Sequence, residues 1–244
     1  MITKIGDKEL NYEKEGMSPK SILFVHGWGG SIKSLKAVYD LLKKEFQCVI
    51  VDLPGFGKSS MPDPEWGVEE YGQLLTQFIQ KQNLDDLCYV GHSFGGALGV
   101  YLAAQKPEIL QKLVLIAPSY KRDHKKLEFE KSFPGYKKVK PRITPVRKVF
   151  YKVMHPGSDI FKYPELESNF RKIVGQDLTS LVPKINQKTL IIWGDEDKYV
   201  PVSDAYYLKE KISDAKLLVY PKFGHDFPKI APVSVYRDVR EFLT

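Results

Sequence analysis

An eleven-residue stretch in the first half of the chain, LCYVGHSFGGA from Leu87 to Ala97, constrains the fold more than any other feature. Its apolar start, residues 87–90, predicts a buried strand, and the small residues after the serine predict a helix. A strand that turns into a helix with no loop between them brings the two elements very close together. Gly91 and Gly95 lie two residues to either side of Ser93. Because glycine has no side chain, the strand and the helix can approach each other this closely. We expect the serine between them to adopt a strained backbone conformation.

Such a turn exposes the hydroxyl of Ser93 above the edge of the sheet. It also places the backbone N–H of Phe94 at a helix N-terminus, where an amide is well placed to stabilise a developing negative charge. The pentapeptide Gly-x-Ser-x-Gly also occurs in unrelated turns, in which the serine merely caps the helix. The flanking strand and helix favour a catalytic serine, and the rest of the chain must then supply its partners.

Size and composition predict one large globular domain, because the chain has 244 residues, 43% of them hydrophobic and 27% charged. The sequence shows neither a signal-peptide pattern nor a run of about 18 apolar residues. We therefore expect a cytoplasmic protein with no stable membrane insertion. Cys48 and Cys88 each begin a predicted strand, which argues against a disulfide framework and against a zinc site.

The net charge of +7 is unevenly distributed. Residues 120–185 hold 16 Lys and Arg against 7 Asp and Glu, so the remainder of the chain is close to neutral. A basic segment of this kind either attracts anionic substrates or surfaces, or is the solvated face of helices. No nucleic-acid-binding motif accompanies the charge, and we expect no nucleic-acid partner.

Most of the chain alternates short apolar runs with helical patterns, which predicts βαβ units. The first two strands instead form a hairpin through a turn at Gly6. The predicted fold class is therefore α/β, with a mostly parallel eight-stranded sheet flanked by helices. The strands are expected at residues 2–5, 10–13, 22–25, 49–51, 87–90, 113–116, 189–193 and 216–219. Helices are expected after Ser93, at about 34–45, 68–82 and 203–212, and around Val235 to Phe242.

The alternation breaks between residues 120 and 185, where no clear strand is found. Two segments there have apolar residues on one helical face, the first after Pro145 and the second after Pro164. The segment is too short and too weakly apolar to form its own core. We predict a core of residues 1–119 and 186–244, with residues 120–185 inserted in it as a helical lid.

Five short motifs follow one another along the chain. They are HGWG from His26, DLPGFG from Asp52 with Ser59 after it, GHSFGG from Gly91, WG with Asp197 and Pro201 after it, and Gly224-His225. In order and spacing these motifs resemble the α/β-hydrolase fold family, in particular its small, lid-bearing carboxylesterases and related serine hydrolases. The resemblance covers nearly the whole chain outside the predicted lid.

A serine hydroxyl is a poor nucleophile at neutral pH, so Ser93 needs a base to take its proton. His225 is the candidate, since it follows the last predicted strand and a glycine. Of the other histidines, His26 is expected to be structural and His92 to point elsewhere, whereas His124 and His155 lie in the predicted lid.

The imidazole in turn needs an acid that fixes its tautomer. The resemblance implies Asp197 for that role, with Asp195 and Glu196 as rivals in the same loop. It also implies that the backbone N–H groups of Phe94 and Trp28 form the oxyanion hole, Trp28 being the residue after His26-Gly27.

A serine at this turn, where some relatives carry a carboxylate, predicts acyl transfer through an acyl-enzyme with no cofactor and no metal. Our first hypothesis is a carboxylic-ester hydrolase whose partner is a small-molecule ester. Trp28 and the lid aromatics Phe129, Phe133 and Phe150 are candidate substrate-binding residues, although lid aromatics can equally serve to pack the lid on the sheet. Hydrolysis of carbon–carbon bonds, thioesters or lipids by the same three residues stays open. So does a low-turnover ligand-binding protein on the same scaffold.

Overall fold

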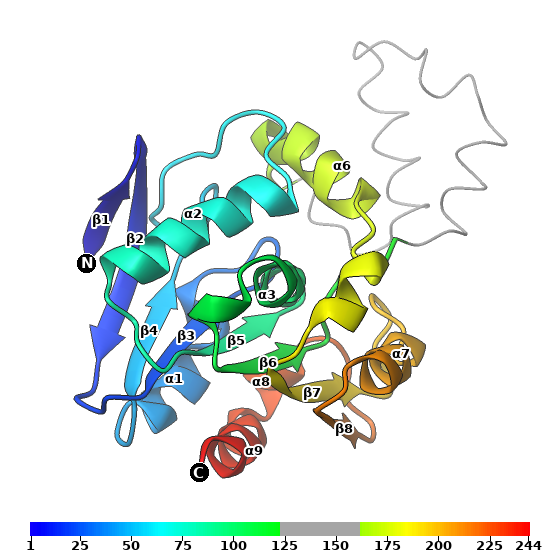
Figure 1. The fold of residues 1–244 in the computed structure, drawn as a ribbon. Helices are drawn as coiled ribbons and strands as arrows, with labels where there is room; N and C mark the ends of the chain where they lie inside the picture. Colours follow the sequence, from blue (N-terminus) through cyan, green and yellow to red (C-terminus); the bar gives the residue numbers. More distant parts are fainter. Residues whose placement is uncertain (123–161) are drawn as a thin grey trace, which may run out of the picture.

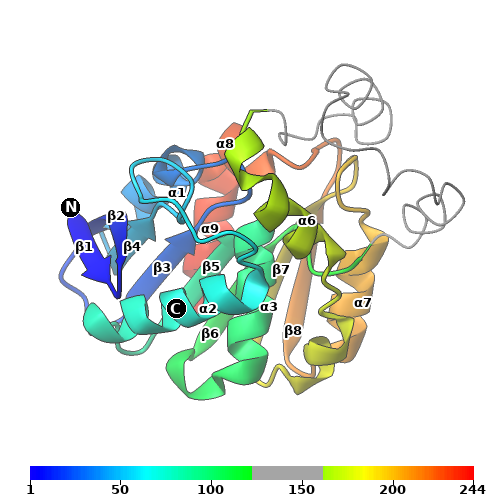
Figure 2. The same ribbon diagram turned by 90° about the horizontal axis from the view of Figure 1, so that it is seen from above.

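The computed structural model describes residues 1–122 and 162–244 (Figure 1). In that part of the chain eight strands form one sheet, in the order β1-β2-β4-β3-β5-β6-β7-β8. Strand β2 is antiparallel to both of its neighbours, and the remaining pairs are parallel. Figure 2 shows the strands side by side in this order. The predicted fold class is confirmed.

The strands lie where the apolar runs predict them, with ends that differ by one or two residues. The difference that matters most is in β5, where Gly91 and His92 continue the parallel pairing with β6. Ser93 is therefore the first residue after the strand. The bounds are β1 Ile2–Ile5, β2 Lys8–Glu15, β3 Ser21–Val25, β4 Gln47–Val51, β5 Cys88–His92, β6 Lys112–Ile116, β7 Lys188–Gly194 and β8 Ala215–Tyr220.

The first predicted helix is shorter than expected, because Leu35 leaves the helical conformation and separates a 3-10 turn, η1 Ile32–Ser34, from α1. Helix α8 has four residues, too few for a periodic pattern, and was not predicted. The helices are α1 Lys36–Leu42, α2 Val68–Lys81, α3 Phe94–Gln105, α6 Glu167–Gly175, α7 Ser203–Lys211, α8 Phe227–Ile230 and α9 Pro232–Leu243, with 3-10 turns η2 Pro107–Ile109, η5 Pro164–Leu166 and η6 Thr179–Lys184.

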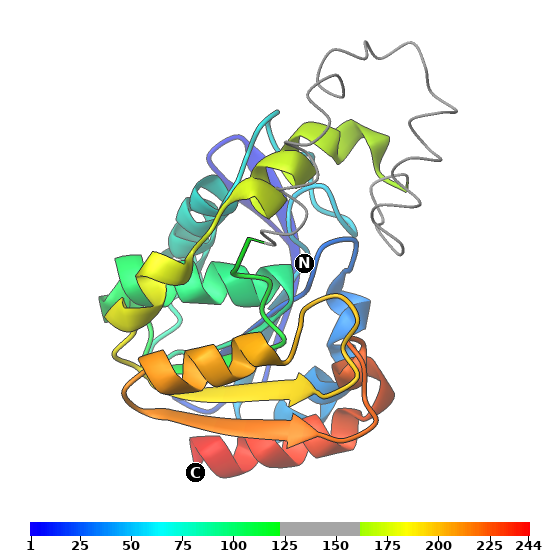
Figure 3. The same cartoon turned by 90° about the vertical axis from the view of Figure 1, so that its right-hand side faces the viewer.

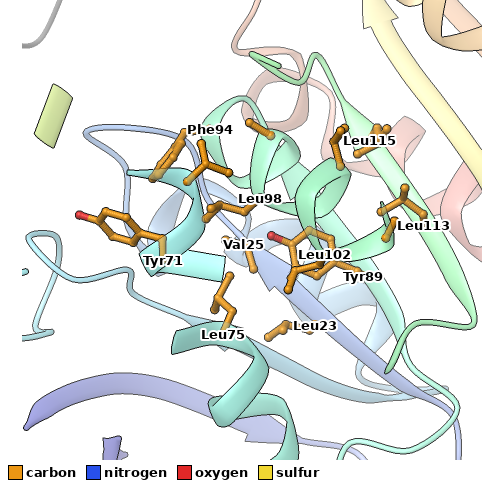
Figure 4. Close-up of a cluster of buried hydrophobic side chains, with 14 of the residues drawn as sticks. Leu23, Val25, Tyr71, Leu75, Tyr89, Phe94, Leu98, Leu102, Leu113 and Leu115 are labelled. Carbon is orange, nitrogen blue, oxygen red and sulfur yellow. The ribbon is translucent and has the colours of Figure 1, made fainter. Parts of the chain in front are cut away.

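Two layers of helices bury both faces of the central strands. In β3, Leu23 and Val25 contribute to one apolar cluster, which includes residues of α2, α3 and α7, and the alternate residues contribute to a second cluster with α1 and α9. Figure 3 shows α7 and α9 on opposite sides of β7 and β8. Figure 4 shows Leu98 and Leu102 of α3 above Leu23 and Val25. Burial on both faces explains why these strands are nearly continuous apolar runs.

The described end of the predicted lid packs against the core. Leu166 is fully buried, Lys172 forms a 2.6 Å ion pair with Glu70 of α2, and the side chain of Gln176 accepts a 2.8 Å hydrogen bond from the backbone of Val68. Figure 1 shows α6 beside the first turn of α2. The predicted helix after Pro164 is thus present as η5 and α6, whereas the one predicted after Pro145 lies outside the described residues.

The carboxylate of Asp52, directly after β4, joins three segments of the loop layer. It accepts hydrogen bonds from the backbone N–H groups of Ile32 (2.7 Å) and Lys58 (2.9 Å) and from the side chain of Asn11 (2.7 Å). It is also buried. Gly57 has a φ of +59°, and a Cβ there would lie 2.1 Å from the Asp52 carboxylate. Asp52 therefore has a structural role.

We predict that Asp52→Ala lowers the free energy of unfolding by about 2–5 kcal/mol, because two backbone N–H groups lose their buried acceptor. Urea unfolding followed by circular dichroism measures the change. Asp85→Ala, at an exposed position, is the matched control and should change the free energy by less than about 0.5 kcal/mol. Equal stability of Asp52→Ala and wild type would contradict the structural role.

Candidate active site

Ser93 has the strained backbone that the sequence predicts, with φ 52° and ψ −114°. Its neighbours leave no room for side chains. A Cβ on Gly91 would lie 2.3 Å from the carbonyl oxygen of Gly95, and a Cβ on Gly95 would lie 2.2 Å from the carbonyl oxygen of Val25. The Ser93 N–H donates a 2.9 Å hydrogen bond to Ile116 at the end of β6. The turn is therefore held by the ends of two neighbouring strands.

The turn after β3 lies against the serine. A Cβ on Gly27 would lie 2.9 Å from the Cβ of Ser93. Trp28 is the next residue after Gly27 in the chain, and so it is adjacent to the residue that contacts the serine. His26 fixes this turn: its Nδ1 lies 2.7 Å from the carbonyl oxygen of Gly27, and its Nε2 accepts a 3.0 Å hydrogen bond from the backbone of Leu53. Burial lowers the pKa of His26, so this structural histidine stays neutral.

The candidate acid and base are joined by a short hydrogen bond, 2.7 Å between Nδ1 of His225 and Oδ2 of Asp197. The other carboxylate oxygen of Asp197 accepts the N–H groups of Tyr199 (2.8 Å) and Val200 (2.9 Å). Burial alone would raise the pKa of Asp197, but the hydrogen bond from His225, the charge of that ring and the two amides outweigh it and lower the pKa. Asp197 thus stays ionised and holds Nδ1 of His225 protonated, which leaves Nε2 free to accept a proton.

The two rival carboxylates are placed differently. Asp195 and Glu196 are both exposed, and Asp195 accepts a 2.7 Å hydrogen bond from the backbone of Lys222 instead. The geometry thus favours Asp197 as the partner of His225.

No hydrogen bond joins Ser93 Oγ to His225 within residues 1–122 and 162–244. His225, the candidate base, nevertheless lies beside the turn at Ser93, because its carbonyl oxygen is 2.9 Å from Nε2 of His92, the residue directly before Ser93. The two imidazole rings have centroids 4.8 Å apart. In unliganded enzymes catalytic hydrogen bonds are often long and tighten only with substrate.

His92 is the residue that the sequence interpretation misses. It was expected to point elsewhere, but its ring contacts the ring of His225. A signal existed: since β5 extends to His92, the period of two places this side chain on the face of Cys88 and Val90, which the C-terminal elements cover.

An aromatic cluster adjoins the site. Trp28 contacts Phe56 and Phe94 of the core and Phe170 of α6, with ring centroids 5.0, 5.9 and 5.3 Å away. Its indole Nε1 is buried and has no hydrogen-bond partner in the described residues. Tyr163 adds a 3.2 Å hydrogen bond to the carbonyl of Gly29. The predicted substrate-binding residues Phe129, Phe133 and Phe150 lie outside the described residues.

Within residues 1–122 and 162–244, no three His, Cys, Asp or Glu side chains gather closely enough to hold a metal ion. Nor does any helix of that part have the length and apolar character needed to span a bilayer.

A family model for the alpha/beta hydrolase fold matches residues 20–142 and 162–230. The chain belongs to the α/β-hydrolase fold family. This α/β-hydrolase is 24% identical over 245 residues to Lipase 3 of Moraxella sp. (strain TA144), covering 90% of this chain and 76% of the lipase. It is also 24% identical over 248 residues to 2-hydroxy-6-oxo-6-(2'-aminophenyl)hexa-2,4-dienoic acid hydrolase of Metapseudomonas resinovorans, covering 90% and 82% of the two chains.

Among solved structures, a thermophilic esterase from Thermogutta terrifontis superimposes on the α/β-hydrolase with a TM-score of 0.74 and 23% identity, covering 99% of this chain and 96% of the esterase. At this identity the likeness shows the fold. Family and relatives together show a hydrolase.

The buried neutral histidines predict a loss of stability below neutral pH. Burial, reinforced by the charge of His225, lowers the pKa of His92 from 6.5 to about 3, against smaller opposing effects of Asp197 and the His225 carbonyl. Between these two values the unfolded chain binds a proton that the folded protein excludes, so stability falls as pH decreases through 6.5.

From pH 7 to pH 5 His92 alone should remove about 2 kcal/mol from the free energy of unfolding. Urea unfolding at the two pH values measures the loss, and His92→Gln should reduce it by that amount. An unchanged pH dependence in His92→Gln would contradict the prediction.

Proposed function

We propose that this α/β-hydrolase cleaves carboxylic esters of small molecules, with Ser93 as nucleophile, His225 as base and Asp197 as the acid that orients the base. The observation that carries the proposal is the 2.7 Å hydrogen bond between His225 and the buried Asp197, beside a serine on a strained turn at a helix N-terminus. Those are the parts that activate a serine hydroxyl.

In the proposed reaction, Ser93 Oγ bonds to the acyl carbon while its proton passes to Nε2 of His225. The former carbonyl oxygen takes the negative charge, and the backbone N–H groups of Phe94 and Trp28 stabilise it, each worth roughly 2.7–4 kcal/mol in the transition state. His225 then gives the proton to the leaving alkoxide as its C–O bond breaks. Water releases the acyl group from Ser93 by the same two steps.

Esters are the favoured substrates because a serine nucleophile with an imidazole base forms and hydrolyses an acyl-enzyme without a cofactor. Similarity to a lipase supports this choice, and similarity to a dienoic acid hydrolase supports hydrolysis of carbon–carbon bonds as the second candidate. A thioester or lipid substrate would use the same three residues. A low-turnover ligand-binding role is the alternative outside catalysis.

We further propose that residues 120–185 form the lid and shape the acyl pocket. The aromatic contact of Phe170 with Trp28 supports this placement, because it brings α6 to the residue that would bind the oxyanion. Among the described residues the indole N–H of Trp28 has no hydrogen-bond partner, and we propose it as a donor to the substrate. We expect the protein to act in the cytoplasm. We expect it to have no nucleic-acid partner.

Ser93→Ala should abolish covalent labelling by a fluorophosphonate and lower hydrolysis of p-nitrophenyl butyrate by several orders of magnitude, since the nucleophile is lost. Gel fluorescence and initial rates measure the two effects. Ser119→Ala, an exposed serine near the same turn, is the control and should keep both. Wild-type labelling in Ser93→Ala would refute the proposal, and single-turnover behaviour of the wild type with every ester would favour the binding protein.

Asp197→Asn should lower kcat by about 10⁴-fold, because the amide no longer holds His225 in the right tautomer. The control is Asp195→Asn, which keeps an oxygen for the backbone of Lys222 and should retain nearly full activity. Initial rates at saturating ester compare the two variants. If Asp195→Asn lost activity and Asp197→Asn kept it, the acid would be Asp195.

A further inference from the structure

The site divides into two units that few bonds join. The acid and base loops form one unit: the Asp195 N–H donates to Tyr220 (3.1 Å), and the Glu196 N–H donates to Phe223 (3.0 Å). The backbone of Lys222 donates to Asp195, and His225 binds Asp197. None of these contacts involves the nucleophile turn.

The nucleophile turn belongs to a different part of the sheet. Ser93 follows β5, whereas His225 follows β8, and β6 and β7 lie between those strands. At about 4.8 Å per strand, the base loop has to reach across roughly 14 Å of sheet. The contacts between the base loop and the acid loop fix the base loop near β7 and β8, and they do not fix its distance from β5.

A single described hydrogen bond connects the two units, the 2.9 Å contact between Nε2 of His92 and the carbonyl oxygen of His225. A carbonyl oxygen only accepts, so Nε2 of His92 carries the proton. The ring is buried, and a Cβ on Gly27 would lie 3.4 Å from its Nδ1. His92 therefore contacts both His225 and the turn at Gly27, and it is covalently joined to Ser93, the next residue in the chain.

We propose that His92 is a positioning residue that holds the backbone of His225 at the distance from which its imidazole reaches Ser93. The inference rests on the proposed function and deepens it. His92 touches no reacting atom and exchanges no proton in the reaction. His92 acts by holding the backbone of His225. Because the His92 ring is buried and stays neutral, it donates the same hydrogen bond throughout the working pH range.

Three variants test this role: His92→Leu and His92→Met, which remove the donor, and His92→Gln, whose Nε2 lies the same number of bonds from Cα and restores it. A displaced base should lower kcat by up to about 100-fold in His92→Leu while KM stays within about twofold, because orientation and not binding is lost. His92→Gln should recover most of kcat. Thermal unfolding identifies folded variants, and His92→Met replaces His92→Leu if the latter unfolds.

A background without the base separates positioning from a general structural effect. In His225→Ala, adding His92→Leu should leave the residual activity unchanged, because the group that His92 positions is absent. Three results would overturn the inference: unchanged kcat in folded His92→Leu, equal loss in His92→Gln and His92→Leu, or a further loss in the His225→Ala background. Failure of the proposed function has a different signature, namely wild-type rates in Ser93→Ala.

Discussion

The close approach of the start of α3 to the end of β3 is the contact on which the site depends. Gly95 lies so near the carbonyl of Val25 that any side chain would force the helix away. This contact and the hydrogen bond to Ile116 hold Ser93 in a backbone conformation that an isolated peptide would not adopt. The strained conformation costs of order 1–3 kcal/mol. The packed sheet offsets that cost. The turn places Ser93 at the N-cap of α3 and the amide of Phe94 at the first helical position.

Around this contact the site is assembled from loops that follow the carboxyl ends of parallel strands, the edge at which ligands bind in such sheets. The turn after β3 is fixed by His26, and the turn after β4 by Asp52. The proposed acid, Asp197, and the proposed base, His225, follow β7 and β8. His26 and Asp52 join the turns after β3 and β4 to each other, the loops after β7 and β8 hold each other, and the bond from His92 to His225 relates the two pairs.

The fold followed from the sequence because buried parallel strands are continuous apolar runs, and because Gly91 and Gly95, placed between an apolar run and a helical pattern, permit the close strand-to-helix turn at Ser93. Local periodicity predicted α2 and α9 well, since both have long amphipathic patterns. It missed α8, which is a single turn, and the contact of His92, which depends on a loop 133 residues away. Spacing alone also left three carboxylates as candidate acids. Only the fold shows that the backbone of Lys222 engages Asp195 while Asp197 faces the imidazole.

The direct pairing of β6 with β7 has a consequence for how such a protein diversifies. Lys112 to Ile116 pair in register with Lys188 to Ile192, although some seventy residues separate the two strands in the chain. The sheet is therefore complete whatever connects them, and loop closure costs only about 0.6 kcal/mol for each doubling of length. The length of the intervening segment can therefore change through evolution without disrupting the pairing of β6 with β7, and specificity can drift while the proposed reactive groups stay in place.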